Sequence, residues 1–288
     1  MAISSAEWTV LSMLEWATGY FDKKGIRNPR LSIEWLLSEV LEVKRLDLYL
    51  MHDRPLTSFD LEKLKPFILR RAKHEPLQYI IGFTDFFGLT FSVDQNVLIP
   101  RPETEQLVEL VLNEFDNQQT LKIIDIGTGS GCIPISLKSQ KPNWNLSAVD
   151  ISDKALTIAK QNSIRNNVDV EFRIANLFMK DQFPEMNNFD VLISNPPYVL
   201  ESEKTTLDDE VIRFEPSEAL FCESTEGIYT ALRILAEKII KIEGTVFLEL
   251  NERFGKQVND IFSTKNWQPK LIKDYGSKDR FLVAKKVQ

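Results

Sequence analysis

Apolar residues in the first 75 positions recur at the spacing of an α-helix. Three segments carry apolar side chains mostly three or four residues apart: Val10, Leu14, Ala17 and Phe21; Ile33, Leu37, Val40 and Leu41; and Leu61, Leu64 and Ile68. Ser4-Ser5-Ala6-Glu7 has the form of a capping box, and Asn28-Pro29 is typical of a cap followed by proline at the first helical position. Residues 1–75 are therefore predicted to form a small helical domain.

The polar face of the third predicted helix is basic, with Lys63, Lys65, Arg70, Arg71 and Lys73. Charged side chains at helical spacing usually face water, so we expect a solvated surface here. The alternative is a contact surface for an acidic or ribosome-associated partner.

The apolar period changes from 3.6 to 2 at Pro76. Leu89, Phe91 and Val93 alternate with polar residues, as in a half-buried strand. Because glycines punctuate this segment, we expect a β-hairpin across about residues 78–98. The predicted organisation is a helical domain of residues 1–75, a β-hairpin linker of residues 76–98, and a third part of residues 99–288.

Strand-like and helix-like segments alternate from about Leu121 onwards. The predicted strands cover residues 122–126, 146–150, 170–175, 189–194 and 245–250, and the tail adds a closing pair around residues 271–272 and 280–284. Such alternation is typical of a mostly parallel sheet that is covered by helices on both faces. The expected fold class is α/β, with a doubly wound, mostly parallel, seven-stranded sheet.

The composition of the 288 residues limits the classes of function. With 43% hydrophobic and 27% charged residues, the chain is neither disordered nor fibrous. Its formal net charge of −7 argues against direct contact with nucleic acid, since such surfaces are usually basic. Two cysteines and two histidines without ligand spacing argue against a metal site. No apolar run approaches the ~20 residues that cross a bilayer, so we expect a cytoplasmic protein without membrane contact.

A glycine-rich segment follows the first predicted strand of the sheet. Gly127-Thr128-Gly129-Ser130-Gly131 lets the backbone turn tightly, and the N–H groups at the start of the next helix can face a ligand. Its spacing differs from the G-x-G-x-x-G of dinucleotide-binding proteins. Asp150, at the end of the next strand, can accept hydrogen bonds from both hydroxyls of a ribose. Together these residues indicate a cofactor that contains adenosine. The alternative for the glycine segment is a plain strand–helix turn without a ligand, and the alternative for Asp150 is a helix cap.

Asn195-Pro196-Pro197-Tyr198 follows the fourth predicted strand. The two prolines lack N–H groups, so the backbone is stiff and cannot continue a sheet ladder. The main-chain oxygens of Asn195 and Pro196, and the side-chain oxygen of Asn195, can accept hydrogen bonds from a substrate –NH2 group. Tyr198 adds a flat face. All three motifs fall at the carboxyl ends of strands, where ligands bind in open α/β sheets.

These motifs resemble those of class I S-adenosylmethionine-dependent methyltransferases that modify planar nitrogens. The segments PLQYIIG at residues 76–82 and VLIPRPETE at residues 97–105 are similar to those of the release factor glutamine methyltransferases, the PrmC/HemK family. Glu215-Pro216, Ala219-Leu220, Gly276 and Asp279-Arg280-Phe281 fit the same pattern, so the resemblance covers nearly the whole chain. It implies a seven-stranded methyltransferase sheet, S-adenosyl-L-methionine as cofactor, and methylation of the side-chain amide nitrogen (N5) of the glutamine in the Gly-Gly-Gln motif of peptide chain release factors. The helical domain would help to dock the release factor, and we expect a monomer.

The resemblance also assigns roles to residues. Catalytic roles fall to Asn195, Pro196 and Tyr198; substrate binding to Asn195, Pro196, Pro197 and Tyr198; and cofactor binding to Gly127, Thr128, Gly129, Ser130, Gly131, Asp150, Asn176, Leu177 and Asn195. Asn176 and Leu177 stand where the family often has an acidic residue followed by Trp or another large residue. Glu249-Leu250-Asn251 stands where the family commonly ends in glycine. Arg101-Pro102-Glu103-Thr104-Glu105 is expected to shape the floor of the pocket, and the alternative is that Thr104 merely starts a helix. The acidic segment of residues 199–223 is either a lid over the substrate or an exposed loop.

Three other functions remain open at this point. A ribosomal-protein glutamine methyltransferase would share the catalytic part of the chain. An adenine-N6 DNA methyltransferase would use the same tetrapeptide on a flipped base, although the net charge argues against it. A release-factor-binding or ribosome-binding module with an inactive methyltransferase domain is the third.

Overall fold

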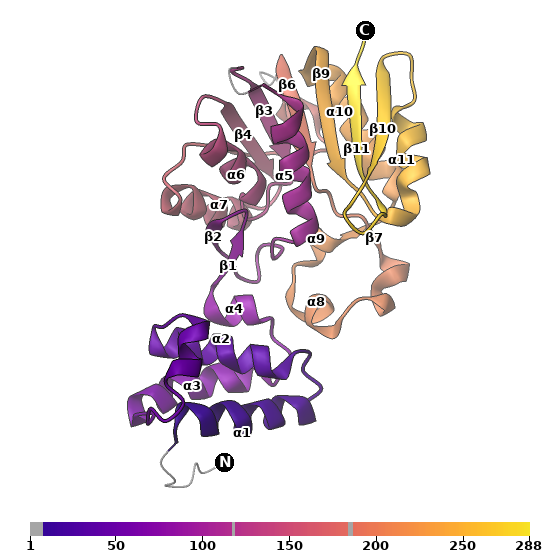
Figure 1. Ribbon diagram of the computed structural model, residues 1–288. Helices are drawn as coiled ribbons and strands as arrows, with labels where there is room; N and C mark the ends of the chain where they lie inside the picture. The colour runs from indigo at the N-terminus through magenta and orange to yellow at the C-terminus, as the bar shows by residue number, and fades with distance from the viewer. Residues whose placement is uncertain (1–7, 117–118, 184–186) are drawn as a thin grey trace. The chain divides into compact units, whose positions relative to one another are not determined.

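The structure is a computed structural model that describes residues 8–116, 119–183 and 187–288 (Figure 1). The contacts within the chain divide it into two units. One contains the chain up to Gly82 together with Asp208–Phe214, and the other contains Phe83–Leu207 and Glu215–Gln288. Each unit has a hydrophobic core of its own.

The first unit is helical. Its elements are α1 (Val10–Lys23), α2 (Pro29–Leu41), a 3-10 helix (Arg45–Leu50), α3 (Ser58–Arg71), α4 (Leu77–Ile81) and α8 (Asp209–Phe214). The predicted stripes of α1 and α2 are confirmed, because all eight of their residues are buried. Thr9 caps α1 by accepting from the Ser12 N–H, whereas the capping sequence predicted at residues 4–7 lies outside the described residues. Pro29 begins α2 as predicted, but Asn28 adopts a left-handed conformation and its side chain makes no capping bond.

The prediction that the basic side chains of α3 face water is wrong for Arg71. This side chain is buried, and its guanidinium donates to Ser32 Oγ, to the main-chain oxygen of Glu75 and to both carboxylate oxygens of Glu210 in α8. Arg70 forms an ion pair with Glu75. Glu210, which is 139 residues away in the sequence, therefore covers part of the α3 face that the local pattern predicts to be exposed to solvent.

The predicted hairpin begins the second unit and is shorter than expected. Strands β1 (Phe83–Phe86) and β2 (Leu89–Ser92) are antiparallel, and Phe87 and Gly88 between them both have positive φ, as in a type I′ two-residue hairpin turn. The residues before β1, expected to be part of the hairpin, instead form the short helix α4. That helix follows Pro76 and ends at Gly82, which has a φ of 86°.

The α/β fold class is confirmed by a sheet of seven strands. These are β3 (Lys122–Ile126), β4 (Asn145–Asp150), β5 (Glu171–Ile174), β6 (Phe189–Ser194), β9 (Ile240–Glu249), β10 (Trp267–Lys273) and β11 (Asp279–Lys286). Their order is β10-β11-β9-β6-β3-β4-β5. All pairs are parallel except those of β11, which runs antiparallel to both β9 and β10. The chain leaves β3 toward β4 on one side and reaches β6 on the other, so the strand order reverses between β3 and β6, where open α/β sheets bind ligands.

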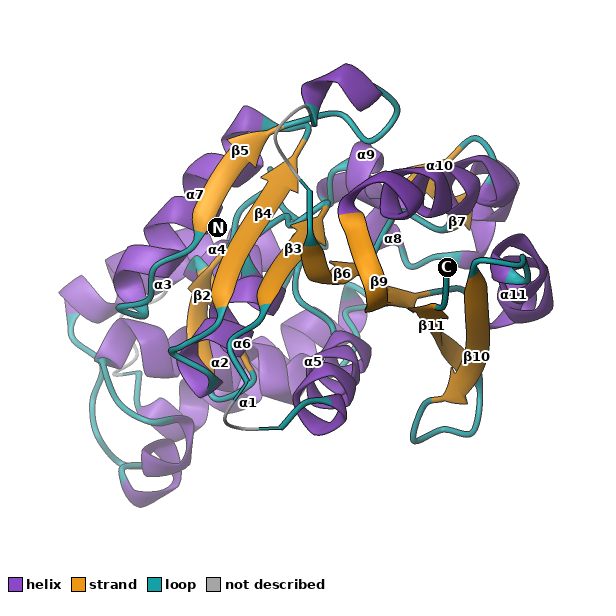
Figure 2. Ribbon diagram, turned by 90° about the horizontal axis from the view of Figure 1, so that it is seen from above, coloured by secondary structure: helices purple, strands orange, loops and turns teal. Residues whose placement is uncertain are grey.

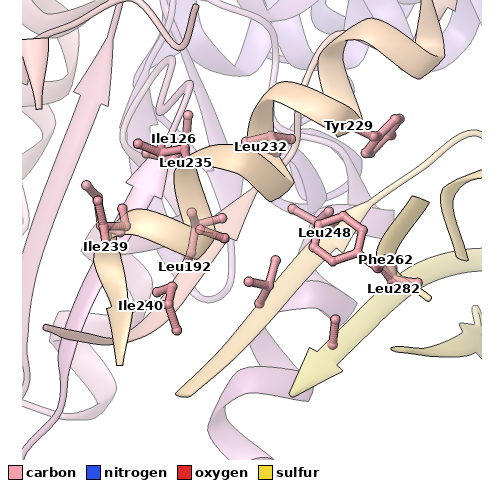
Figure 3. Close-up of a cluster of buried hydrophobic side chains, with 14 of the residues drawn as sticks. Ile126, Leu192, Tyr229, Leu232, Leu235, Ile239, Ile240, Leu248, Phe262 and Leu282 are labelled. Carbon is pink, nitrogen blue, oxygen red and sulfur yellow. The ribbon is translucent and has the colours of Figure 1, made fainter. Parts of the chain in front are cut away.

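Helices cover both faces of this sheet (Figure 2). They are α5 (Pro102–Glu114), α6 (Cys132–Gln140), α7 (Asp153–Arg165), α10 (Thr225–Ile239) and α11 (Gly255–Phe262), with the short α9 (Ser217–Leu220). One apolar cluster joins α5 and α6 to the sheet, and another joins α10 and α11 to the opposite face. In Figure 3, Leu232, Leu235 and Ile239 of α10 lie beside Leu192 and Leu248 of the strands. These cores hold the strand ends that carry the candidate site.

Candidate active site

A pocket of about 690 Å³ opens at the carboxyl ends of the parallel strands. Its volume is in the range of small-molecule sites. Most of the predicted site residues line it: Gly127, Thr128, Gly129, Ser130, Asp150, Asn176, Leu177, Asn195, Pro196 and Pro197. Gly131 and Tyr198 are not part of its lining. The fold therefore gathers segments from four strand ends into one cavity within the second unit.

The glycine segment forms a left-handed turn between β3 and α6. Gly127, Gly129 and Gly131 have φ angles of 75°, 54° and 80°, which residues other than glycine rarely adopt. Gly131 serves for packing, because a Cβ atom there would lie 2.9 Å from Ile135 Cδ1 and 3.1 Å from Ala159 Cβ. The first two glycines have no such neighbour, so they allow a ligand to approach the main chain.

Asp150 joins this turn to the start of α7. One carboxylate oxygen accepts from the Gly129 N–H at 2.8 Å, and the other accepts from the Ser152 N–H at 2.9 Å. Burial raises the pKa of Asp150, and the N–H groups of Ser152, Gly129 and Ile151 oppose the shift. Ser152, not Asp150, caps α7, since its hydroxyl accepts from the Ala155 N–H. The alternative of a helix cap is therefore wrong for Asp150, and its carboxylate lines the pocket.

Asp125, on β3 beneath the glycine turn, was missed by sequence reasoning. Its carboxyl group is buried, and neither oxygen makes a hydrogen bond within the described parts of the chain. Burial raises its pKa to about 7; the neighbouring Thr128 hydroxyl opposes this shift, and the charge of Asp150 adds to it. A cation bound beside the turn would compensate for this carboxylate. The available signal was an acidic residue inside the apolar run of β3.

The Asn-Pro-Pro-Tyr segment begins where the ladder between β6 and β9 ends, at Ser194. The Ser194 hydroxyl donates to the main-chain oxygen of Ile126 at 2.7 Å, which fixes the ends of β6 and β3 side by side. Asn195 Nδ2 donates to Thr104 Oγ1 at 3.1 Å. Because the amide nitrogen faces Thr104, the side-chain oxygen of Asn195 remains an acceptor on the other side of the amide. Thr104 is inside α5 and also lines the pocket, so it does not merely start the helix.

Glu249, at the end of β9, connects the two halves of the tetrapeptide. Its carboxylate accepts from the Thr104 hydroxyl at 2.8 Å and from the Tyr198 hydroxyl at 3.2 Å. Its side chain is fully buried, and burial raises its pKa to about 7. Burial, and then the charge of Glu249, raises the pKa of Tyr198. Sequence reasoning gave Glu249 no role, although a carboxylate in the apolar run of a central strand was a signal for one.

The acidic segment of residues 199–223 contributes to both units. Strands β7 (Val199–Leu200) and β8 (Phe221–Cys222) pair in parallel, and residues 216, 218–219 and 221–224 line the pocket. Glu215 is buried and accepts from Arg101 Nη2 at 2.6 Å. Within this segment, α8 belongs to the helical unit. Whether the segment closes over a substrate stays a prediction.

The described residues show neither of two other classes of site. Among residues 8–116, 119–183 and 187–288, no group of three or more His, Cys, Asp or Glu side chains is arranged to bind a metal ion. In the same part of the chain, no helix combines the length and the apolar character needed to span a membrane.

Two known domain families match different parts of the chain. Residues 12–82 match the PrmC N-terminal domain, and residues 102–256 match the methyltransferase small domain. The chain is 38% identical over 269 residues to the release factor glutamine methyltransferase of Flavobacterium psychrophilum, covering 91% of this chain and 92% of that one. It is 36% identical over 283 residues to that of Chlorobaculum tepidum, covering 96% of each. A methyltransferase from Pyrococcus furiosus shares the fold, with a TM-score of 0.52 and 19% identity over 70% of this chain and 91% of that one. The chain therefore belongs to the release factor glutamine methyltransferase family.

Proposed function

We propose that this protein methylates the side-chain amide nitrogen of the glutamine in the Gly-Gly-Gln motif of peptide chain release factors, using S-adenosylmethionine. The observation that carries the proposal is the Asn195 corner. It lines the same pocket as the glycine turn, with the amide nitrogen of Asn195 engaged by Thr104. Membership of the family supports the substrate, since the relatives of this chain are named release factor glutamine methyltransferases.

The residues of the pocket fit a cofactor that combines an adenosine with cationic groups. Asp150 lines the pocket, and its carboxylate can accept hydrogen bonds from the ribose hydroxyls. The buried carboxyl group of Asp125, beneath the turn and outside the pocket lining, favours a cation beside the turn. Asn176 and Leu177 line the pocket. The Asn176 amide would form a hydrogen bond with the adenine, and the apolar side chain of Leu177 would cover the ring. When bound, S-adenosylmethionine supplies an electrophilic methyl group.

The tetrapeptide would orient the substrate amide. A carboxamide nitrogen is a poor nucleophile because its lone pair is delocalised into the carbonyl group. Asn195 Oδ1 and the main-chain oxygen of Pro196 would accept its two N–H hydrogens. Preorganised groups of this kind are often worth about 2.7–4 kcal/mol each in the transition state, and alignment of the reacting atoms contributes further. Tyr198 would confine the plane of the amide from beside the pocket.

No strong general base is needed for this reaction. The methylated amide nitrogen is very acidic until it loses its proton, so water can accept that proton. The residues that line the pocket agree with such a mechanism, because they include no histidine.

Labelled S-adenosylmethionine and a purified release factor test the proposal directly. We expect a mass increase of one methyl group on the Gly-Gly-Gln peptide and none when this glutamine is replaced by alanine. Ribosomal proteins and double-stranded DNA in parallel reactions test the other two methyltransferase functions. Methylation of either, with an unmodified release factor, would contradict the proposal, as would no transfer to any substrate.

Asn195→Ala tests the catalytic corner. The expected loss in single-turnover rate is about 100-fold or more, because one preorganised acceptor is removed. Asn143→Ala is the matched control, since Asn143 is an exposed amide whose contact is to the main-chain oxygen of Gln119, not to the pocket. A rate for Asn195→Ala within about threefold of the control would show that this amide does not hold the substrate.

A further inference from the structure

A chain of buried hydrogen bonds leads from Glu249 to the side chain of Asn195. Asn195 Nδ2 donates to Thr104 Oγ1 at 3.1 Å, and the Thr104 hydroxyl donates to Glu249 Oε2 at 2.8 Å. The second carboxylate oxygen, Oε1, accepts from the Tyr198 hydroxyl at 3.2 Å. The Glu249 side chain does not line the pocket, so it acts on a ligand there only through these neighbours.

The direction of these bonds follows from the chemistry of the groups. An ionised carboxylate has no hydrogen to donate, so it only accepts. A hydroxyl has one hydrogen, and the hydrogen of Thr104 goes to Glu249. The Thr104 oxygen can then only accept from Asn195, which turns the amide nitrogen of Asn195 toward Thr104 and its oxygen away. The reversed amide would present an –NH2 group where the proposed reaction needs an acceptor.

We propose that Glu249 is a positioning residue, which acts through Thr104 to set the orientation of the Asn195 amide and holds the Tyr198 hydroxyl with its other oxygen. The proposal rests on the function proposed above, because that function makes the Asn195 oxygen the acceptor of the substrate amide. Glu249 touches neither reactant. Its role is to decide which atom of Asn195 faces the substrate.

Neighbouring groups favour opposite protonation states of Glu249. Burial favours the neutral acid, whereas the hydrogen bonds from Thr104 and Tyr198 and the charge of Arg280 favour the carboxylate, and the charge of Glu103 opposes it. Tyr229 packs against the same strand end, with its hydroxyl donating to the main-chain oxygen of Glu249 at 2.9 Å, and the thiol of Cys132 is also close enough to interact electrostatically. With a pKa of about 7, Glu249 gains a proton as the pH falls below neutrality.

Protonation would reverse part of the chain of bonds. A hydrogen on Oε2 points at the Thr104 oxygen, so the Thr104 hydroxyl turns its own hydrogen toward Asn195 and favours the reversed amide. The rate constant for methyl transfer should therefore fall as the pH decreases through about 7 and level off above it.

Two variants at position 104 separate this role from packing. Thr104→Val keeps the volume and removes the hydroxyl, whereas Thr104→Ser keeps the hydroxyl. We expect Thr104→Val to lower kcat by about tenfold and to flatten the decline below pH 7, and Thr104→Ser to restore both to within about threefold of the wild type. Glu249→Gln should also lower kcat at pH 8 and abolish the decline. The KM for S-adenosylmethionine and the dissociation constant of adenosylhomocysteine should change less than about threefold, because the relay acts on the substrate amide.

A second measurement needs no enzymatic activity. Carbon NMR of labelled glutamate side chains reports the titration of Glu249 in the free protein. Thr104→Val removes a bond that favours the carboxylate, so the pKa of Glu249 should rise, while Thr104→Ser should leave it unchanged. Circular dichroism of each variant checks that it is folded.

The outcomes distinguish the two proposals. A wild-type enzyme that leaves the release factor unmodified would refute the proposed function, and the pKa of Glu249 would then still report whether the relay exists. Wild-type activity together with an unchanged kcat, pH profile and Glu249 pKa in Thr104→Val would refute the relay alone. An equal loss in Thr104→Ser and Thr104→Val would also refute it, because the hydroxyl would then not be the part of the side chain that matters.

Discussion

The buried carboxyl group of Asp125 should lower the stability of the ligand-free protein at neutral and alkaline pH, where the group is ionised. Burial moves the pKa of Asp125 from 3.8 to about 7, although the neighbouring Thr128 hydroxyl opposes this shift. In the unfolded chain the group ionises at its ordinary pKa, so the folded state binds the extra proton between these two values. Stability therefore decreases as the pH rises from about 4 to about 7, by about 4 kcal/mol in total, and then remains constant.

Asp125→Asn removes the charge while keeping the shape. An unsatisfied buried amide costs about 1–3 kcal/mol, so at pH 8 the variant should be more stable than the wild type by about 1–3 kcal/mol. Between pH 5 and pH 8 the difference in unfolding free energy should grow in favour of the variant by about 2–3 kcal/mol, because only the wild type has the carboxyl group. Other titrating groups, Glu249 included, occur in both proteins, so their contributions cancel in the difference between the two unfolding free energies.

Urea unfolding of the ligand-free proteins at the two pH values measures this difference. Asp190→Asn is the control, because the carboxylate of Asp190 is paired: it accepts from the Lys122 N–H at 2.7 Å and forms an ion pair with Lys241. That substitution should lower stability at pH 8. A stability difference for Asp125→Asn that is the same at pH 5 and pH 8, or that favours the wild type more at pH 8, would refute the reasoning. Adenosylhomocysteine, which has a cationic ammonium group, should stabilise the wild type more than Asp125→Asn.

Three further substitutions probe the turn, the ribose site and the helical unit. Gly131→Ala combines a positive φ with a methyl group 2.9 Å from Ile135 Cδ1, so the unfolding free energy should drop by about 2 kcal/mol or more; an unchanged value would contradict the packing role. Asp150→Asn keeps one acceptor for two N–H groups, so calorimetry should show a roughly tenfold weaker affinity for adenosylhomocysteine, and an unchanged affinity would exclude the ribose role. Arg71→Met should speed hydrogen exchange of the α8 amides much more than Arg27→Met does, because the ion pair of Arg27 to the same segment is exposed; equal effects would contradict this.

The sequence determined the local features of this protein. Helices, strands and the hairpin were predicted from the spacing of apolar residues, which depends on the geometry of each element alone. The glycine turn and the Asn-Pro-Pro-Tyr corner were predicted because glycine and proline restrict or release the backbone wherever they occur. Since parallel strands end at one edge of a sheet, the order of elements also placed these motifs around one pocket.

The tertiary structure alone decided which side chains pair in the interior. Thr104 meets Glu249 across 145 residues, and Arg71 meets Glu210 across 139, so no local pattern could connect them. The burial of Asp125 likewise depends on everything packed around it. A charge or a donor that is shielded from water must find its partner within the protein. Each buried polar group therefore fixes the orientation of the side chains to which it bonds. The residues that touch a ligand could therefore be read from motifs, whereas those that orient them became visible only once the chain was folded.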